Sequence, residues 1–325
     1  MNIPILLITF NRSDYTRCVL TEILKQEPQS LYVCQDGARE GNVNDQIKCQ
    51  EVRDVVNELT SAYKTKHAHF TLHTLFHKNN LGCGPGPAAG ITWFFDNVEQ
   101  GIIIEDDCLP HPDFFGYCDE LLERYKNDER IGFIGGCNYV NLNTSFSYSF
   151  SGGHHQTWGW ATWRRTWQHF DYYLTSISMK DFALSLREYC ISWRQREYWW
   201  MIYNLVKKNQ MNHSCWDYQF LFSCWNAHQY AIAPTVNLVS NIGCGADATH
   251  TSVQGTMLLK SVEPILPLVH PQNVKLDKAL DFELMKIHIA PYDFGRIGIK
   301  RFIFLLNRYI KRITGHQGSW IKKKK

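Results

Sequence analysis

The sequence has little that would suit a secreted or membrane-spanning protein. Its 11 cysteines are scattered, without a CxxC pair or a zinc-ligand spacing, so neither a disulfide framework nor a zinc finger is indicated. No segment reaches the roughly 20 apolar residues that a membrane-spanning helix needs. The apolar run at 3–10 is too short for a signal peptide. We therefore expect reduced thiols and a cytoplasmic protein.

Acidic residues are absent from the end of the chain. From Arg296 onward there are ten Lys/Arg and no Asp/Glu, whereas the preceding residues hold 24 Lys/Arg and 31 Asp/Glu. On a helical wheel of 296–313, basic residues share one arc and bulky apolar residues the other, with Phe304 as the exception. This pattern suits a helix lying in a membrane surface, and an ordinary helix packed on the domain is the alternative. We expect the protein to lie peripherally at the inner face of the cell membrane. Nucleic-acid binding is not expected, because the basic residues concentrate in this tail rather than around a groove.

Apolar runs and amphipathic segments alternate through the first 135 residues. The runs predict strands and the amphipathic segments predict helices. The expected strands are 3–10, 31–37, 69–77, 101–105 and 131–136, and the expected helices are 14–26, 44–62, 87–98 and 114–128. For the first helix, Ser13 or Asp14 is the expected N-cap. Such alternation predicts an α/β fold, with a mostly parallel sheet flanked by helices on both faces.

Beyond this region the composition changes. Residues 150–230 are rich in aromatic residues and are expected to be mostly helical after the WGWATW motif, whereas 230–243 has the composition of a strand. We expect three parts: a catalytic domain over 1–255, a C-terminal extension over 256–294 and a basic amphipathic tail over 295–325.

Three adjacent carboxylates, Glu105, Asp106 and Asp107, stand at the end of the predicted strand 101–105. Like charges at a buried strand end repel each other, and leaving them unpaired costs several kcal/mol. Ligands of parallel sheets bind at the carboxyl ends of strands, where Asp36 also falls. Mg²⁺ or Mn²⁺ bound to a nucleotide diphosphate needs only one or two protein carboxylates. The triplet therefore indicates a cation site, although an isolated acidic turn at the surface has the same residues.

Several motifs in order carry a resemblance to a known family. They are IPILLITFNRSDYTRCVLTEIL, LYVCQDG, IIIEDDCLPHPDFFGYCDELL, TWGWATWRRTW, SCWDYQFLFSCWNA and NLVSNIGCGADATHT. Together they resemble the catalytic domain of N-acetylglucosaminyltransferase I and bacterial nucleotide-diphospho-sugar transferases of the same GT-A type, over roughly residues 1–250. The resemblance implies a GT-A fold and an inverting, Mn²⁺- or Mg²⁺-dependent transfer of a sugar from a nucleotide diphosphate sugar, expected to be UDP-linked.

The resemblance also implies roles for the residues around the triplet. Arg12 corresponds to an arginine that contacts the nucleotide, and Asp36 to the acid that reads the nucleobase. Asp107 corresponds to the direct metal ligand. Glu105 and Asp106 correspond to the pair that holds hydroxyls of the ribose and the donor sugar.

Later motifs supply the remaining site residues. Asp217 resembles the catalytic base that deprotonates the acceptor hydroxyl; Glu197 is the fallback, and a helix N-terminal acid favoured by the dipole is the plain alternative for Asp217. Gly159 and Trp160 resemble the wall of the donor-sugar site, with close backbone approach at the glycine and stacking or water exclusion by the tryptophan. His250 matches a late histidine that completes the metal shell in many GT-A enzymes.

Some features receive a different expectation. Trp163 and Trp167, four residues apart, are expected in the core, and His154 and His155 receive no role. The loop 80–90 is rich in Gly and Pro but lacks the Lys and Ser/Thr of a P-loop, which puts the nucleotide contact expected near it in doubt.

Two rival functions stay open beside the transfer of a sugar to a surface polysaccharide or a lipid-linked oligosaccharide in a bacterium. A sugar-phosphate nucleotidyltransferase usually carries a Gly-rich basic loop after the first strand, where this chain has TFNRSDYT. A non-catalytic glycan- or membrane-binding protein with a degenerate site is the second rival, against which the intact Asp107 and Asp217 argue.

Overall fold

The computed structural model describes residues 1–289, apart from 141, 143, 154–156, 210, 212–213 and 244–261. The strands are β1 (Ile5–Thr9), β2 (Ser30–Gln35), β3 (Thr71–Phe76), β4 (Gln100–Glu105), β5 (Cys108–Pro110), β6 (Ile131–Gly135), β7 (Tyr148–Ser151), β8 (Trp160–Trp163), β9 (Tyr230–Pro234) and β10 (Val239–Asn241). The helices are α1 (Ser13–Leu24), α2 (Val43–Lys64), α3 (Pro85–Asn97), α4 (Pro112–Arg124), α5 (Arg164–Trp167), α6 (Met179–Tyr189), α7 (Trp193–Lys207), α8 (Asp217–Asn226) and α9 (Lys278–Ile289).

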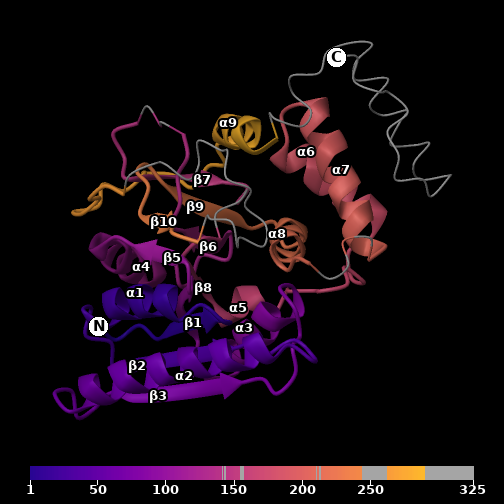
Figure 1. The fold of residues 1–325 in the computed structure, drawn as a ribbon. Coiled ribbons are helices and arrows are strands. Elements are labelled where there is room, and N and C mark those ends of the chain that lie inside the picture. Colours follow the sequence, from indigo (N-terminus) through magenta and orange to yellow (C-terminus); the bar gives the residue numbers. More distant parts are fainter. Residues whose placement is uncertain are drawn as a thin grey trace, which may run out of the picture.

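Eight strands form one sheet in the order β3-β2-β1-β4-β8-β6-β9-β7 (Figure 1). Strands β3, β2, β1 and β4 are parallel, and β6 is parallel to β9. Strand β8 runs antiparallel between β4 and β6, and β7 is an antiparallel edge strand. A second, two-stranded sheet pairs β5 with β10. The sheet is therefore mixed and mostly parallel.

Successive side chains of the central strands point to opposite faces of the sheet, and each face has its own core. On β1, Ile5 and Leu7 belong to a cluster with apolar residues of α1, α2 and α4. Leu6 and Ile8 belong to a cluster with residues of α3, α5 and α8. Because both faces are covered, these strands read as continuous apolar runs in the sequence. The predicted α/β fold, a mostly parallel sheet flanked by helices, is confirmed.

A third cluster lies beyond the sheet, among α6, α7 and α8, and it includes Met285 of α9. Figure 1 shows α6 and α7 at the side of the molecule away from β3. The core side of α7 includes Trp199, Ile202 and Tyr203, which are buried. These helices confirm the helical prediction for most of 164–226.

Three local predictions differ from the structure. Residues Trp160–Trp163 form a strand inside the sheet, and no strand was predicted there. The N-cap of α1 is Arg12, without a side-chain hydrogen bond, and neither Ser13 nor Asp14 occupies that position. Strand β7 precedes the WGWATW motif, and no strand was predicted there.

Two bulk predictions concern cysteines and membrane spans. Ten cysteines lie within the described residues, and all ten are free thiols. None of the helices in the described part of the chain is long and apolar enough to cross a membrane. The amphipathic tail, residues 295–325, lies outside the described residues.

Candidate functional site

The carboxyl ends of β1, β2 and β4 meet at one edge of the sheet. The parallel register pairs Thr9 with Gln35 and Ile8 with Glu105, so the residues that follow these strands lie side by side. Strand β1 leads to Arg12, β2 to Asp36, and β4 to the acidic triplet. This edge is where the sequence placed the ligand, and it is where parallel sheets bind ligands.

Asp107 accepts hydrogen bonds from two distant parts of the chain. The Nη1 atom of Arg12 donates to its Oδ2 at 3.0 Å, and the Nδ2 atom of Asn241 donates to its Oδ1 at 3.4 Å. A Cβ atom on Gly243 would collide with the Asp107 carboxylate, so only glycine fits there without a shift. Asn241 and Gly243 were not singled out from the sequence, although they lie in the NLVSNIG motif.

Glu105 and Asp106 carry strongly perturbed carboxyl groups. Burial, followed by the charges of Asp107, Asp106 and Asp217, raises the pKa of Glu105 to about 8. Burial and the charge of Asp107 raise the pKa of Asp106 to about 7, although the backbone N–H of Phe10 donates to its Oδ2 at 3.2 Å. Burial is the larger cause of both shifts, and the charge of neighbouring carboxylates adds to it.

A divalent cation fits this donor set. A cation bound here would favour the ionised form of these carboxyl groups, and hard cations prefer carboxylate oxygens. Within the described residues, no group of three or more His, Cys, Asp and Glu side chains is arranged to hold a metal ion. An ion bound at Asp107 would therefore take other oxygens, such as those of water or phosphate, as Mg²⁺ usually does. The predicted ligand His250 lies outside the described residues.

Asp36 organises the loop before α3. Its Oδ1 accepts hydrogen bonds from the backbone N–H groups of Gly37 and Leu81, and its Oδ2 from Gly82 N–H and Asn80 Nδ2, all at 2.8–2.9 Å. Four donors fill the acceptor sites of one carboxylate. A nucleobase N–H would therefore have to replace one of these bonds. The base-reading role stays a prediction, and the loop-anchoring role is one that the sequence did not indicate.

Cys83 links this loop to the segment before α8. Its Sγ donates to the carbonyl oxygen of Ser214 at 3.5 Å. Burial, followed by the charges of Asp36, Glu105 and Asp217, raises the pKa of the Cys83 thiol. Carboxylates from three separate parts of the sequence thus contribute to the raised pKa of this one thiol. No motif marks Cys83 as part of a site, because its neighbours come from distant segments.

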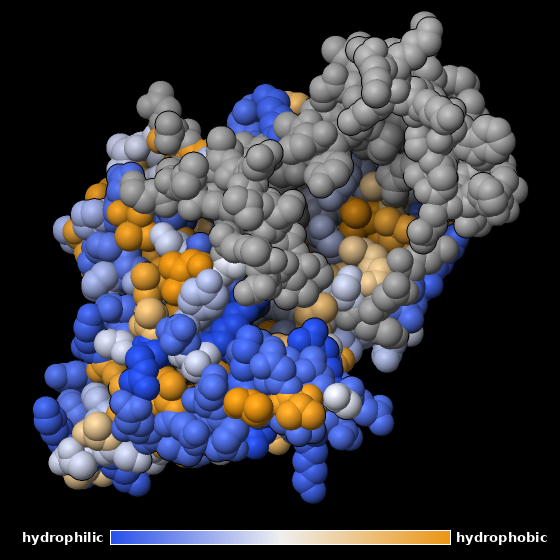
Figure 2. Space-filling model, viewed as in Figure 1, coloured by the Kyte–Doolittle hydropathy of each residue, from blue (hydrophilic) through white to orange (hydrophobic). Residues whose placement is uncertain are grey.

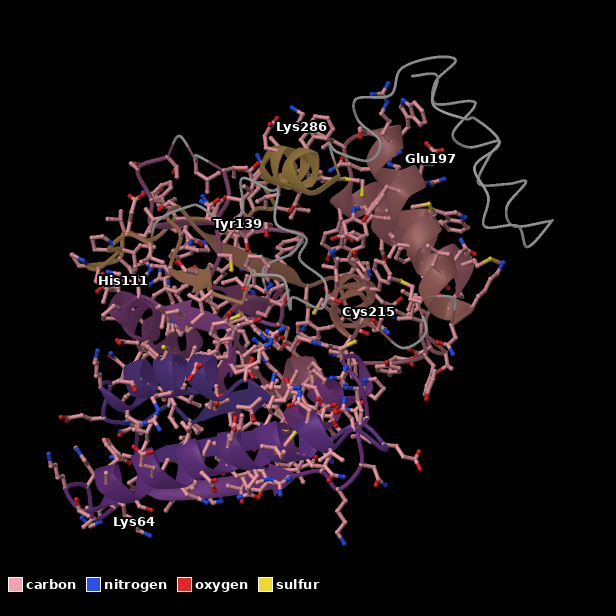
Figure 3. The ribbon with its side chains drawn as sticks, in the orientation of Figure 1. Lys64, His111, Tyr139, Glu197, Cys215 and Lys286 are labelled. Atoms are coloured by element: carbon pink, nitrogen blue, oxygen red, sulfur yellow. The ribbon has the colours of Figure 1, made fainter. Side chains whose placement is uncertain are left out.

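Asp217 is the first residue of α8, and Figure 3 marks Cys215 just before it. Its charge contributes to the raised pKa of Glu105, so it lies close to the triplet. It also lines a small pocket whose other walls are Phe133, Gly153, Thr157, Trp199, Tyr218, Phe220 and Leu221. The fallback base, Glu197, is exposed near the start of α7 (Figure 3).

The predicted sugar wall at Gly159 and Trp160 is corrected by the packing. Trp160 is 1% exposed, and its ring packs against Phe133, Trp167, Trp216 and Phe220. Gly159 has φ +63°, and a Cβ there would meet Val239 at 2.7 Å, so its close approach is to protein. Both residues build the core beneath the site. Trp163 and Trp167, 3% and 6% exposed, are core residues as predicted, and His154 and His155 lie outside the described residues.

Comparisons with known proteins give only distant likenesses. No protein-family model matches the chain, and no curated protein matches it. Residues 1–349 of TarS from S. aureus align with a TM-score of 0.32 and 11% identity, over 50% of this chain and 47% of that one. HddC from Yersinia pseudotuberculosis aligns with a TM-score of 0.29 and 9% identity, over 50% of this chain and 77% of that one. The chain spans about half the length of the TarS fragment, and these TM-scores carry no conclusion about activity.

Proposed function

We propose that this chain is an inverting, metal-dependent glycosyltransferase that moves a sugar from a nucleotide diphosphate sugar to a glycan hydroxyl. The observation that carries the proposal is the acidic triplet at the end of β4, with Arg12 paired to Asp107 and the charge of Asp217 reaching Glu105. A cation at this edge and a separate carboxylate facing it are what the reaction requires. The family resemblance of the motifs supports the same reading.

Each residue has a role in the proposed reaction. Asp217 accepts the proton of the acceptor hydroxyl, whose oxygen forms the new bond to the anomeric carbon while the bond to the diphosphate oxygen breaks. Arg12 contacts the nucleotide, and Glu105 and Asp106 accept hydrogen bonds from ribose and sugar hydroxyls. Asp107 holds Mn²⁺ or Mg²⁺, which when bound neutralises charge on the departing diphosphate.

The proposed donor is a UDP-sugar, and the proposed acceptor is a surface polysaccharide or a lipid-linked oligosaccharide. The amphipathic pattern of 296–313 supports an acceptor at a membrane, and with it a peripheral location at the inner face of the cell membrane. Asp36 is the proposed residue that recognises the nucleobase, and a hydrogen bond from the base would replace one of its hydrogen bonds from the loop.

Hydrolysis of a panel of nucleotide sugars with Mn²⁺ tests the proposal. Wild type is expected to cleave at least one donor, and Asp107→Asn is expected to lower that rate at least about 100-fold, because a metal ligand is lost. Asp54→Asn, an exposed aspartate of α2, is the matched control and should retain the wild-type rate. Equal rates in wild type and Asp107→Asn would overturn the metal assignment.

The same panel separates the rivals. Pyrophosphate release from a nucleoside triphosphate and a sugar phosphate, without cleavage of any nucleotide sugar, would identify a nucleotidyltransferase. Saturable binding of a nucleotide sugar without turnover of any donor would identify a non-catalytic binding protein.

Protection of Cys83 offers a test of nucleotide binding that does not depend on turnover. Cys83 and Cys18 are the exposed cysteines among the described residues, and the charges of three candidate site residues act on Cys83. UDP with Mn²⁺ is expected to slow alkylation of Cys83 at least fivefold and to leave Cys18 on α1 unchanged. Mass spectrometry of the alkylated peptides measures both rates. Equal protection of the two thiols, or of neither, would contradict nucleotide binding at this edge.

A further inference from the structure

Exposed apolar side chains are concentrated in the sequence around α6 and the start of α7. Of the 11 large hydrophobic residues that are exposed in the described part of the chain, five lie between positions 173 and 193: Tyr173, Met179, Leu184, Ile191 and Trp193. The exposed fractions of the last three are 50%, 50% and 62%. Isolated exposed apolar residues are normal, whereas such a concentration marks an interaction site.

Basic side chains lie among these apolar ones. Arg187 is exposed on the last turn of α6, between Leu184 and Ile191 in the sequence. The guanidinium carbon of Arg194 lies 5.6 Å from the centre of the Trp193 ring. We call Leu184, Arg187, Ile191, Trp193 and Arg194 the α6–α7 corner.

The charge of this region is opposite to that of the rest of the body. Residues 178–209 hold six Lys/Arg and three Asp/Glu, a net charge of +3. The other residues before Arg296 hold 18 Lys/Arg and 28 Asp/Glu, a net charge of −10. The corner is therefore part of a basic region on an acidic body, which selects an anionic partner.

Helix α9, the last described helix of the chain, packs beside this region. Met285 of α9 packs in the same cluster as α6 and α7, and the Nζ atom of Lys278 donates to the carbonyl oxygen of Arg187 at 3.4 Å. The basic sequence 296–313 follows shortly after the end of α9. Helix α9 thus packs beside α6 and α7.

We propose that the α6–α7 corner binds the surface of an anionic phospholipid membrane. Leu184, Ile191 and Trp193 enter the interface, where tryptophan is favoured because one end of its ring is apolar and the other is polar. Arg187 and Arg194 contact lipid phosphates, and each basic residue near such a surface strengthens binding. This proposal does not depend on the proposed reaction. In Figure 2, hydrophobic side chains are exposed beside α7, and another group lies over α2 among hydrophilic ones.

Sedimentation of the full chain with lipid vesicles tests the corner. Wild type is expected to bind phosphatidylglycerol vesicles at least tenfold more tightly than phosphatidylcholine vesicles. Two variants, Leu184→Ser/Ile191→Ser/Trp193→Ser and Arg187→Glu/Arg194→Glu, are each expected to weaken binding to phosphatidylglycerol at least fivefold. The control Val43→Ser/Ile47→Ser removes two exposed apolar residues of α2, 64% and 55% exposed, and should bind as wild type does.

The vesicle experiment has outcomes that would overturn the proposal. Unchanged binding in both corner variants would overturn the proposal and leave any membrane affinity to the tail, and equal losses in the control would show that the effect is not specific to the corner. A wild type that ignores both kinds of vesicle would also overturn it. Thermal unfolding verifies that each variant is folded, and donor cleavage in solution, if present, should be the same in all variants, so failure here is distinct from failure of the proposed function.

Discussion

Replacing Asp217 with asparagine is expected to lower kcat for sugar transfer by about 10²–10⁴-fold, the usual contribution of a general base. Asparagine keeps the size of the side chain and its place at the start of α8 but cannot accept the proton of the acceptor hydroxyl. Donor affinity should change little, because the proposed donor contacts come from β1, β2 and β4. Steady-state transfer at saturating acceptor, together with a nucleotide titration, measures the two quantities separately.

Glu197→Gln is the matched control for this prediction. Glu197 is exposed near the start of α7, whereas the charge of Asp217 acts on Glu105 in the candidate site. The control should therefore retain wild-type kcat. A large loss in Glu197→Gln with normal transfer by Asp217→Asn would transfer the base role to Glu197. Normal transfer by both variants would contradict the inverting mechanism with a carboxylate base.

Much of the fold follows from local sequence, because a strand buried on both faces must be apolar along its whole length. The strands β1, β2, β4 and β6 are of this kind, and each was predicted within a few residues. Strand β8 is different. Its four residues, Trp160–Trp163, take their conformation from pairing with Gln100–Ile103 and with Phe133–Gly135, neighbours that a local pattern does not contain.

The site divides in the same way. The ends of apolar strands locate Asp36 and the triplet in the sequence, because parallel strand ends share one edge. Their partners come from far along the chain: Asp36 bonds to residues 80–82, and Asp107 to Asn241. Trp160 was expected in the wall of the sugar site because its motif resembles that of the family, but its neighbours in space are other aromatic rings. Residue type alone does not distinguish these two settings.

Replacing Glu105 with glutamine is expected to stabilise the metal-free protein while abolishing donor turnover. The gain should be about 1–3 kcal/mol in the free energy of unfolding near pH 8, because a partly desolvated charge beside other carboxylates is removed. The sign follows from the raised pKa. Between the ordinary value of 4.5 and about 8, the folded wild type binds more protons than the unfolded chain, so its stability falls as pH rises through that window. The glutamine variant lacks this fall, and the two proteins should converge below about pH 4.5.

Urea unfolding across this pH range, with a chelator present, measures the difference, and Glu40→Gln, an exposed carboxylate, should track wild type throughout. Adding Mn²⁺ tests whether a bound cation offsets the charge of Glu105. A cation that binds beside Glu105 stabilises the wild type by offsetting the same repulsion that the substitution removes, so the advantage of Glu105→Gln should shrink as Mn²⁺ is added. If the variant is less stable than wild type at pH 8, the carboxylate is already paired in the fold, and the reason for expecting a cation there disappears.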